Sequence, residues 1–239
     1  MRRTRQAFDE QMQDLQRRLV EMGAFVESML GNAVRALAEH DVKLAREVIA
    51  ADDTADDMDL AIEQQCMRLL ALQQPMARDL RTIGTIMKVI SDVERIGDYS
   101  VDIGRTAVRL ADTDYFKPLV DIPRMTDIVR QMLRQALQAL VNRNLDLVTH
   151  VIECDDAVDR LWYGLLDELE GIMQKRPEVV PQAIALLLVA RYLERIADHT
   201  VNIAERIAYM ETGRLETLAP SHRADYRRPE SAEGGPATD

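Results

Sequence analysis

The sequence has little of what β folds and disulfide-stapled folds require. Cysteine occurs twice in 239 residues, aromatic side chains make up 4% of the chain, and there are 10 glycines and 8 prolines. Strands favour β-branched and aromatic residues, and the turns of β folds need frequent glycine and proline. The composition, rich in Ala, Leu, Met, Arg, Glu and Gln, is instead typical of a helical bundle.

The two cysteines, Cys66 and Cys154, are isolated and form no Cys-x-x-Cys motif. A chain of this length can bury a core without covalent cross-links, so we expect reduced core cysteines in a cytoplasmic protein. Long apolar runs are also missing. The longest, Ala183 to Ala190, is far shorter than the roughly 20 residues that cross a bilayer, so we expect membrane association only through partners.

An excess of positive charge is absent as well. The chain has 41 acidic and 30 basic residues and a formal net charge of −11. A protein that binds nucleic acid by neutralising phosphates normally has a basic face and a basic balance. We therefore expect no nucleic-acid partner.

The positions of the prolines divide the chain, because proline in a helix interior costs roughly 3 kcal/mol. None occurs before Pro75, and the next is Pro118. A weak break at Glu39-His40-Asp41, where Asp41 is a candidate N-cap, divides the first stretch in two. Three long helices are predicted before Pro118, at about 6–39, 41–73 and 76–113.

The second half of the chain repeats the first. At an offset of 103 residues, eleven identities fall within 28 positions, from Met29/Met132 to Asp56/Asp159. At an offset of 100, the segment 93–98 (VERIGD) matches 193–198 (LERIAD). The sequence thus predicts an all-α fold, a tandem repeat of two three-helix bundles with six long antiparallel helices. The predicted boundaries are 1–115 for the first bundle, 122–211 for the second and 212–239 for a flexible C-terminal tail.

Pairs of acidic residues spaced i, i+4 recur beside the apolar stripes of the predicted helices. Two pairs lie in each half, on the second and third helix: Asp52/Asp56, Glu94/Asp98, Asp155/Asp159 and Glu194/Asp198. Like charges at this spacing destabilise an isolated helix, so something of opposite charge must compensate.

Two kinds of compensation are open. The pairs either are solvated flanks or are neutralised in inter-helix ion pairs by Arg81, Arg95, Arg191 and Arg195, or else they are the ligands of a shared cation. Two facing pairs supply four hard oxygen ligands, which suit Mg, Mn or Fe better than structural Zn. No cofactor is required by the sequence, and any of these cations is a possible occupant.

Catalytic signatures are missing. There is no nucleophile–base motif, P-loop or dinucleotide fingerprint, so we expect no enzyme. The alternative hypothesis is a carboxylate-rich metal-binding or metal-storage bundle of ferritin-like type, but the Glu-x-x-His motifs of such sites do not occur.

Several motifs resemble those of one family. The segments 74–81 (QPMARDLR), 94–98 (ERIGD) and 194–203 (ERIADHTVNI) are similar to the signatures of PhoU proteins, the accessory proteins of bacterial phosphate-specific transport. The resemblance covers about residues 6–211. It implies a fold of two similar three-helix bundles, and a negative regulator of phosphate uptake and phosphate-starvation signalling.

The resemblance also implies partners and a site. PhoU proteins act in the cytoplasm at the inner membrane face, between the ATPase subunit of the phosphate ABC transporter and the phosphate-sensing histidine kinase, and are generally thought not to be enzymes. Some carry metal clusters on the motif that falls here on Glu94/Asp98 and Glu194/Asp198. A homodimer is expected, because long amphipathic helices leave apolar edges such as that near Phe25 and Met29.

Overall fold

The structure is a computed structural model that describes residues 2–73, 75–214 and 216–218. All of these residues lie in helices, in the connections between them or in the short segment that follows α7. Most of the predicted flexible tail, from residue 219 onward, lies outside the described residues. The expectation of an all-α fold is confirmed, and the helices begin and end as follows: α1 Arg2–Glu39, α2 Val42–Ala50, α3 Asp52–Gln73, α4 Ala77–Leu110, α5 Asp121–Asn142, α6 Leu145–Lys175, η1 Pro177–Val179 and α7 Val180–Thr212.

The predicted junction at Asp41 is present. The Asp41 side chain accepts a hydrogen bond from the backbone N–H of Leu44 at 2.9 Å, which satisfies one of the unpaired donors of the first turn of α2. His40, immediately before it, takes the left-handed conformation that reverses the chain after α1.

The single predicted helix at 41–73 is wrong in one respect, because it is broken at Ala51. The Ala51 N–H is shared between the carbonyls of Glu47 and Val48, both at 3.1 Å, which tightens the turn and ends α2. Asp52 and Asp53 then form the first turn of α3, where the helix dipole favours negative charge. The equivalent stretch of the second half continues without interruption through α6.

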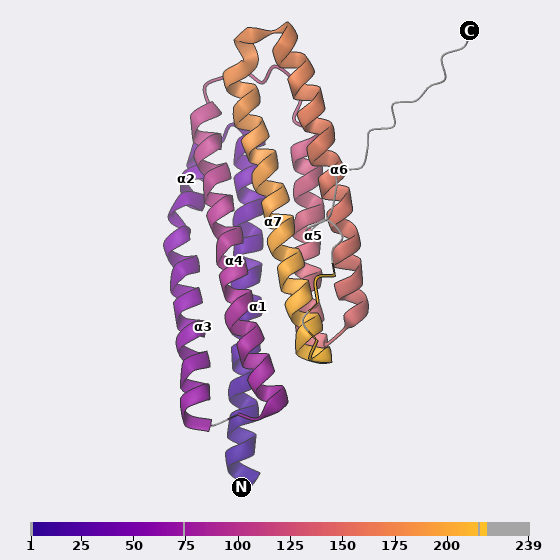
Figure 1. Cartoon of the computed structure of the whole chain (residues 1–239). Coiled ribbons are helices and arrows are strands. Elements are labelled where there is room, and N and C mark those ends of the chain that lie inside the picture. Colours follow the sequence, from indigo (N-terminus) through magenta and orange to yellow (C-terminus); the bar gives the residue numbers. More distant parts are fainter. Residues whose placement is uncertain (1, 74, 215, 219–239) are drawn as a thin grey trace, which may run out of the picture.

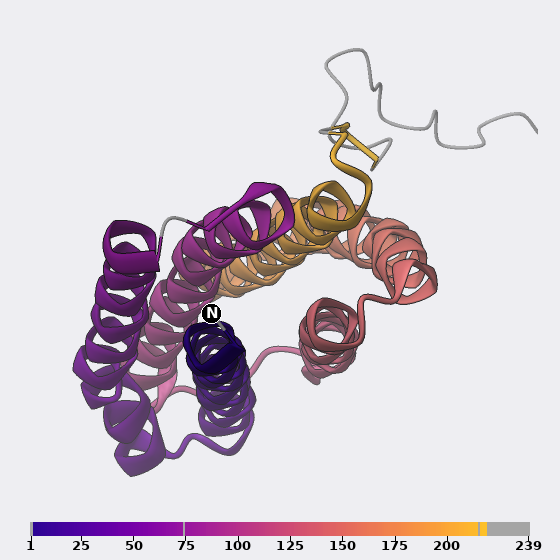
Figure 2. The same ribbon diagram turned by 90° about the horizontal axis from the view of Figure 1, so that it is seen from below.

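The helices form an elongated molecule with two related halves (Figure 1). Viewed along the helices, α3, α4, α7 and α6 form a curved row in that order, and α1 and α5 lie on the inner side of the curve (Figure 2). The central pair, α4 and α7, run antiparallel and pack directly against each other. We call the row formed by these four helices the four-helix face.

The hydrophobic core is continuous across the two halves. Buried apolar residues of α1 and α4, such as Leu30 and Ile90, belong to the same cluster as Leu133 of α5 and Val189 of α7. At Gly104 a side chain would come within 3.3 Å of the Ala45 carbonyl oxygen, so this glycine lets α2 approach α4 closely. The two bundles are therefore packed on one shared core.

The contacts between the halves follow the repeat. His199 Nδ1 of α7 lies 2.8 Å from Asp92 Oδ1 of α4, and the residues equivalent to this pair, Tyr99 and Tyr192, stack with their ring centroids 5.8 Å apart. The α4–α7 seam is thus approximately two-fold symmetric, with an ionisable pair on one side of its centre and an aromatic pair on the other.

A second seam joins α1 to α5. Glu27 Oε1 accepts hydrogen bonds from Arg130 Nε at 2.6 Å and from Arg134 Nη1 at 2.5 Å. Arg130 is the repeat equivalent of Glu27 itself, so this contact also lies near the pseudo-two-fold axis. The Glu27 side chain is only 14% exposed, and two cations therefore hold a largely buried carboxylate between the halves.

We expect Glu27→Ala to lower the free energy of unfolding by about 1–2 kcal/mol, because both arginines lose their acceptor at a partly buried position. Urea denaturation followed by circular dichroism measures the change. Glu21→Ala, which removes an exposed carboxylate bonded to Arg17 on the same helix, is the control and should change stability by less than roughly 0.5 kcal/mol. Equal losses in the two variants would contradict a stabilising role for this seam.

Candidate functional site

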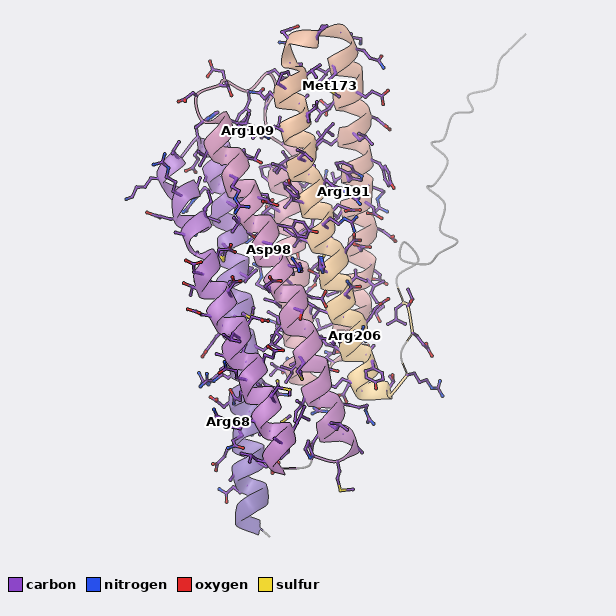
Figure 3. The ribbon with its side chains drawn as sticks, turned by 60° about the vertical axis from the view of Figure 1, so that its left-hand side comes forward. Arg68, Asp98, Arg109, Met173, Arg191 and Arg206 are labelled. Atoms are coloured by element: carbon purple, nitrogen blue, oxygen red, sulfur yellow. The ribbon has the colours of Figure 1, made fainter. Side chains whose placement is uncertain are left out.

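The first carboxylate site lies between α3 and α4 on the four-helix face. Burial and the neighbouring carboxylates of Asp56 and Asp98 raise the pKa of Asp52. Burial, then Asp98 and the α3 carboxylates of Asp56 and Asp59, raise the pKa of Glu94. The structure therefore brings together the two predicted pairs of this half, and Figure 3 marks the position of Asp98 on α4.

The second carboxylate site lies between α6 and α7. Glu194 is 9% exposed, and its Oε2 atom is buried with no hydrogen-bond partner among the described residues. Burial, followed by the charges of Asp198 on the same helix and Asp159 on α6, raises the pKa of Glu194 to about 7. Asp155, one turn before Asp159, is 2% exposed. This site is more deeply buried than the first.

Arginines of the same helix lie beside the acids of α4 and α7. Arg95 lies 3.5 Å from Glu94 and 2.8 Å from Asp98, one turn or less along α4. In α7, Arg191 binds Glu194 and Arg195 lies 3.7 Å from Asp198. Both helices therefore supply part of the countercharge for their own acidic residues.

The two sites differ at positions that the repeat relates. Asp59, which adds a carboxylate to the first site, corresponds to Trp162 in the second, and the Arg191 guanidinium lies 5.8 Å from the Trp162 ring. Asp59 was not predicted from the sequence, because it belongs to no repeated i, i+4 pair. Its position one turn after Asp56, on the same flank, was the available signal.

The carboxylates as placed do not form a ready metal site. Within residues 2–73, 75–214 and 216–218, no three His, Cys, Asp or Glu side chains meet closely enough to hold a metal ion. His199 turns to Asp92 on α4, away from the Glu194/Asp198 row. Metal binding at the eight predicted ligands stays a prediction.

Comparison with known proteins gives the family. The PhoU domain model matches the chain twice, at residues 19–107 and 122–207. The chain belongs to the PhoU family. The two matches coincide with the two halves, so each PhoU domain contributes one carboxylate site to the four-helix face.

Relatives of this PhoU chain carry the corresponding name. The phosphate-specific transport system accessory protein PhoU homolog of Clostridium acetobutylicum is 38% identical over 216 residues, covering 90% of this chain and 99% of that protein. The homolog of the same name in Aquifex aeolicus is 37% identical over 205 residues, covering 86% of this chain and 93% of that protein.

Solved PhoU structures share the fold. The crystal structure of PhoU from Pseudomonas aeruginosa superposes with a TM-score of 0.83 at 35% identity, covering 87% of this chain and all of that one. The phosphate transport system regulatory protein PhoU from Streptococcus pneumoniae gives the same TM-score at 31% identity, covering 88% of this chain and all of that one. The PhoU-like tandem architecture expected from the sequence is confirmed.

Two further expectations from the sequence concern membrane-spanning helices and a dimer surface. None of the described helices combines the length and apolarity needed to cross a membrane. Met29, named as part of an apolar edge for a dimer, is 3% exposed and packs inside the chain, so it offers no dimer surface. Phe25 beside it is half-buried against the same core.

The raised pKa of Glu194 predicts a pH dependence of stability. Between the ordinary glutamate pKa of 4.5 and about 7, the folded state binds more protons than the unfolded state, so stability falls as pH rises through this window. Glu194→Gln removes the buried charge and should raise the free energy of unfolding at pH 8 by up to roughly 3 kcal/mol, with little change at pH 4.

Urea denaturation at both pH values, with a chelator present, measures this difference. The matched control is Glu94→Gln, since Glu94 is the repeat equivalent and its side chain is 25% exposed against 11% for Glu194. At pH 8, Glu94→Gln should raise the free energy of unfolding clearly less than Glu194→Gln does. A stability of the Glu194→Gln variant that tracks the parent at both pH values would contradict the burial of a charged carboxylate here.

Proposed function

We propose that this chain is a phosphate-specific transport system accessory protein and a negative regulator of phosphate uptake and phosphate-starvation signalling. The observation that carries the proposal is the double PhoU match over both halves, shared with relatives named for this system. In this role it links the ATPase subunit of the phosphate ABC transporter to the phosphate-sensing histidine kinase.

The geometry supports an adaptor. An adaptor must offer two surfaces held in a fixed relation, and two related halves on one continuous core provide this. The halves are not chemically equal, since Asp59 and Trp162 occupy equivalent positions in the two sites. Each half can therefore bind a different partner.

The proposed role is non-enzymatic and cytoplasmic, with the membrane reached only through the transporter and the kinase. A homodimer is part of the proposal, although the apolar edge at Met29 does not supply its interface. The ferritin-like alternative is weakened by the arrangement of the carboxylates. They are divided between an α3–α4 site and an α6–α7 site, whereas a ferritin-like centre gathers its ligands inside one four-helix bundle.

We further propose that the eight carboxylates bind cations without requiring them for folding. The site of the first half is the more exposed and the richer in acid, so hard divalent ions or iron would enter it with less desolvation than at the second. Mg, Mn, Fe or Zn would bridge α3 to α4 there, and α6 to α7 in the other half.

Deleting the gene tests the regulatory role. In phosphate-rich medium, a phosphate-starvation promoter should become active in the deletion strain, because the kinase is no longer held in its repressing state. Plasmid expression of the wild-type chain should restore repression. Continued repression in the deletion strain would remove the proposed function, and co-purification with the ATPase subunit and the kinase tests the adaptor step separately.

Double substitutions test the metal sites. Glu94→Ala with Asp98→Ala should abolish cation binding at the first half and leave the second competent, so elemental analysis should show about half the metal of wild type after equilibration. Glu194→Ala with Asp198→Ala is the matched variant of the other half. Metal content equal to wild type in both variants would refute these ligands, and turnover in an iron-oxidation assay would revive the ferritin-like alternative.

A further inference from the structure

Arginines from both halves converge on one carboxylate at one end of the molecule. The beginning of α4, the α5–α6 connection and the end of α7 lie together there (Figure 1). Arg143 Nη1 lies 2.7 Å from Glu211 Oε1, and Arg78 Nη2 lies 3.5 Å from Glu211 Oε2. The Glu211 side chain, in the last turn of α7, is only 16% exposed. Two guanidinium groups therefore meet at a largely buried carboxylate.

Arg81 adds a third guanidinium group to this cluster. It lies one turn after Arg78 on α4, and its Cζ atom is 4.0 Å from the point that a Cβ atom at Gly213 would occupy, two residues after Glu211. The Arg81 Nε atom is buried and has no hydrogen-bond partner among the described residues. Buried N–H groups nearly always have an acceptor, so Arg81 is a cation with an unused donor beside the Glu211 pair.

The charges of the cluster do not balance. Glu211 neutralises one of the three guanidinium groups and leaves two positive charges, in a chain whose net charge is −11. Asp79 projects from α4 roughly 100° away from Arg78 and 160° away from Arg81, on another flank of the helix. The positive end of the α4 dipole and the negative end of the α7 dipole both lie here and largely cancel, so the arginines decide the balance.

The repeat indicates that the fold does not require this cluster. The opposite end of the molecule is built from the equivalent elements, but the side chains there are different: Glu178, Pro181, His40 and Ala111 take the places of Arg78, Arg81, Arg143 and Glu211. The backbone at Arg143 is left-handed with φ 53°, a conformation that glycine adopts at lower cost. The contribution of Arg143 therefore comes from its side chain, which reaches across to α7.

We propose that Arg78, Arg81 and Arg143 bind an inorganic phosphate ion at this end of the α4–α7 seam. A phosphate dianion matches the two positive charges that Glu211 leaves. Its acceptor oxygens point in tetrahedral directions and suit donors that arrive from separate elements, whereas a carboxylate offers its oxygens in one plane. Because Arg78 and Arg81 belong to the first half and Arg143 to the second, the bound ion joins the two halves.

A phospholipid headgroup would supply the same phosphate chemistry. Met76 and Leu80, which are 80% and 49% exposed, lie near the same end of α4. We assign the site to the free ion because its donors are recessed. The Glu211 carboxylate is largely buried and so is the Nε atom of Arg81, which suits a small ion better than a headgroup held in a bilayer.

Isothermal titration calorimetry of the full-length chain with sodium phosphate tests the proposal. The protein is first treated with a chelating resin, and sodium chloride of equal ionic strength is the blank. Wild type should bind phosphate with a Kd below roughly 1 mM. Arg81→Ala should weaken binding at least roughly tenfold, and so should Arg143→Gly, which removes the guanidinium group and keeps the left-handed backbone. Arg17→Ala, at an exposed ion pair of α1, is the control and should stay within about twofold.

Glu211→Gln distinguishes an ion site from a purely structural salt bridge. The substitution removes the negative charge that competes for Arg78 and Arg143, so phosphate should bind at least roughly threefold more tightly. Circular dichroism of each variant checks that the helices are retained. A Glu211→Gln variant that binds phosphate no better than wild type would contradict the proposed charge balance and overturn the site.

Two further outcomes would overturn the proposal. One is the lack of saturable binding up to about 10 mM phosphate, or equal affinity in wild type, Arg81→Ala and Arg143→Gly. The other is sedimentation of wild type with phosphatidylglycerol vesicles that Arg81→Ala abolishes and free phosphate does not compete, which would assign the cluster to a lipid headgroup. All of these measurements use the purified chain alone, so their failure leaves the promoter assay and the proposed function standing.

Discussion

The antiparallel packing of α4 against α7 is the constraint on which the rest of the structure depends. Both helices bury one stripe in the common core, and this fixes the rotation of each about its axis. Their acidic flanks are then forced outward to either side, toward α3 and α6. The positions of Glu94 and Glu194 follow from the burial of Val93 and Leu193, the residues directly before them.

Much of this arrangement could be predicted from the sequence, because it rests on periodicity. The repeated stripes, the prolines between them and the capping carboxylate of Asp41 determine the helices and their number in each half. The break at Ala51 could not be predicted, since alanine favours helix and the close approach of α2 to α4 at Gly104 is a contact between elements far apart in the sequence. The carboxylate of Asp59 was also not predicted, because the repeat has no acid at the equivalent position, Trp162.

The differences between the halves carry more functional information than their likeness. Duplication alone would give two equal sites, yet Ser91 corresponds to Arg191, Asp59 to Trp162 and Arg105 to Glu205. Each change alters the charge at one carboxylate site and leaves the buried stripe intact. The fold is therefore maintained by the buried stripes, while the flanks of the two halves differ in charge.

The shared core also has a thermodynamic consequence. Because buried side chains of α1, α4, α5 and α7 form one cluster, neither half can open without exposing apolar surface of the other. Unfolding is then expected to be a single cooperative event despite the two-part sequence. A ligand that binds only the folded state of one half therefore stabilises both halves against unfolding.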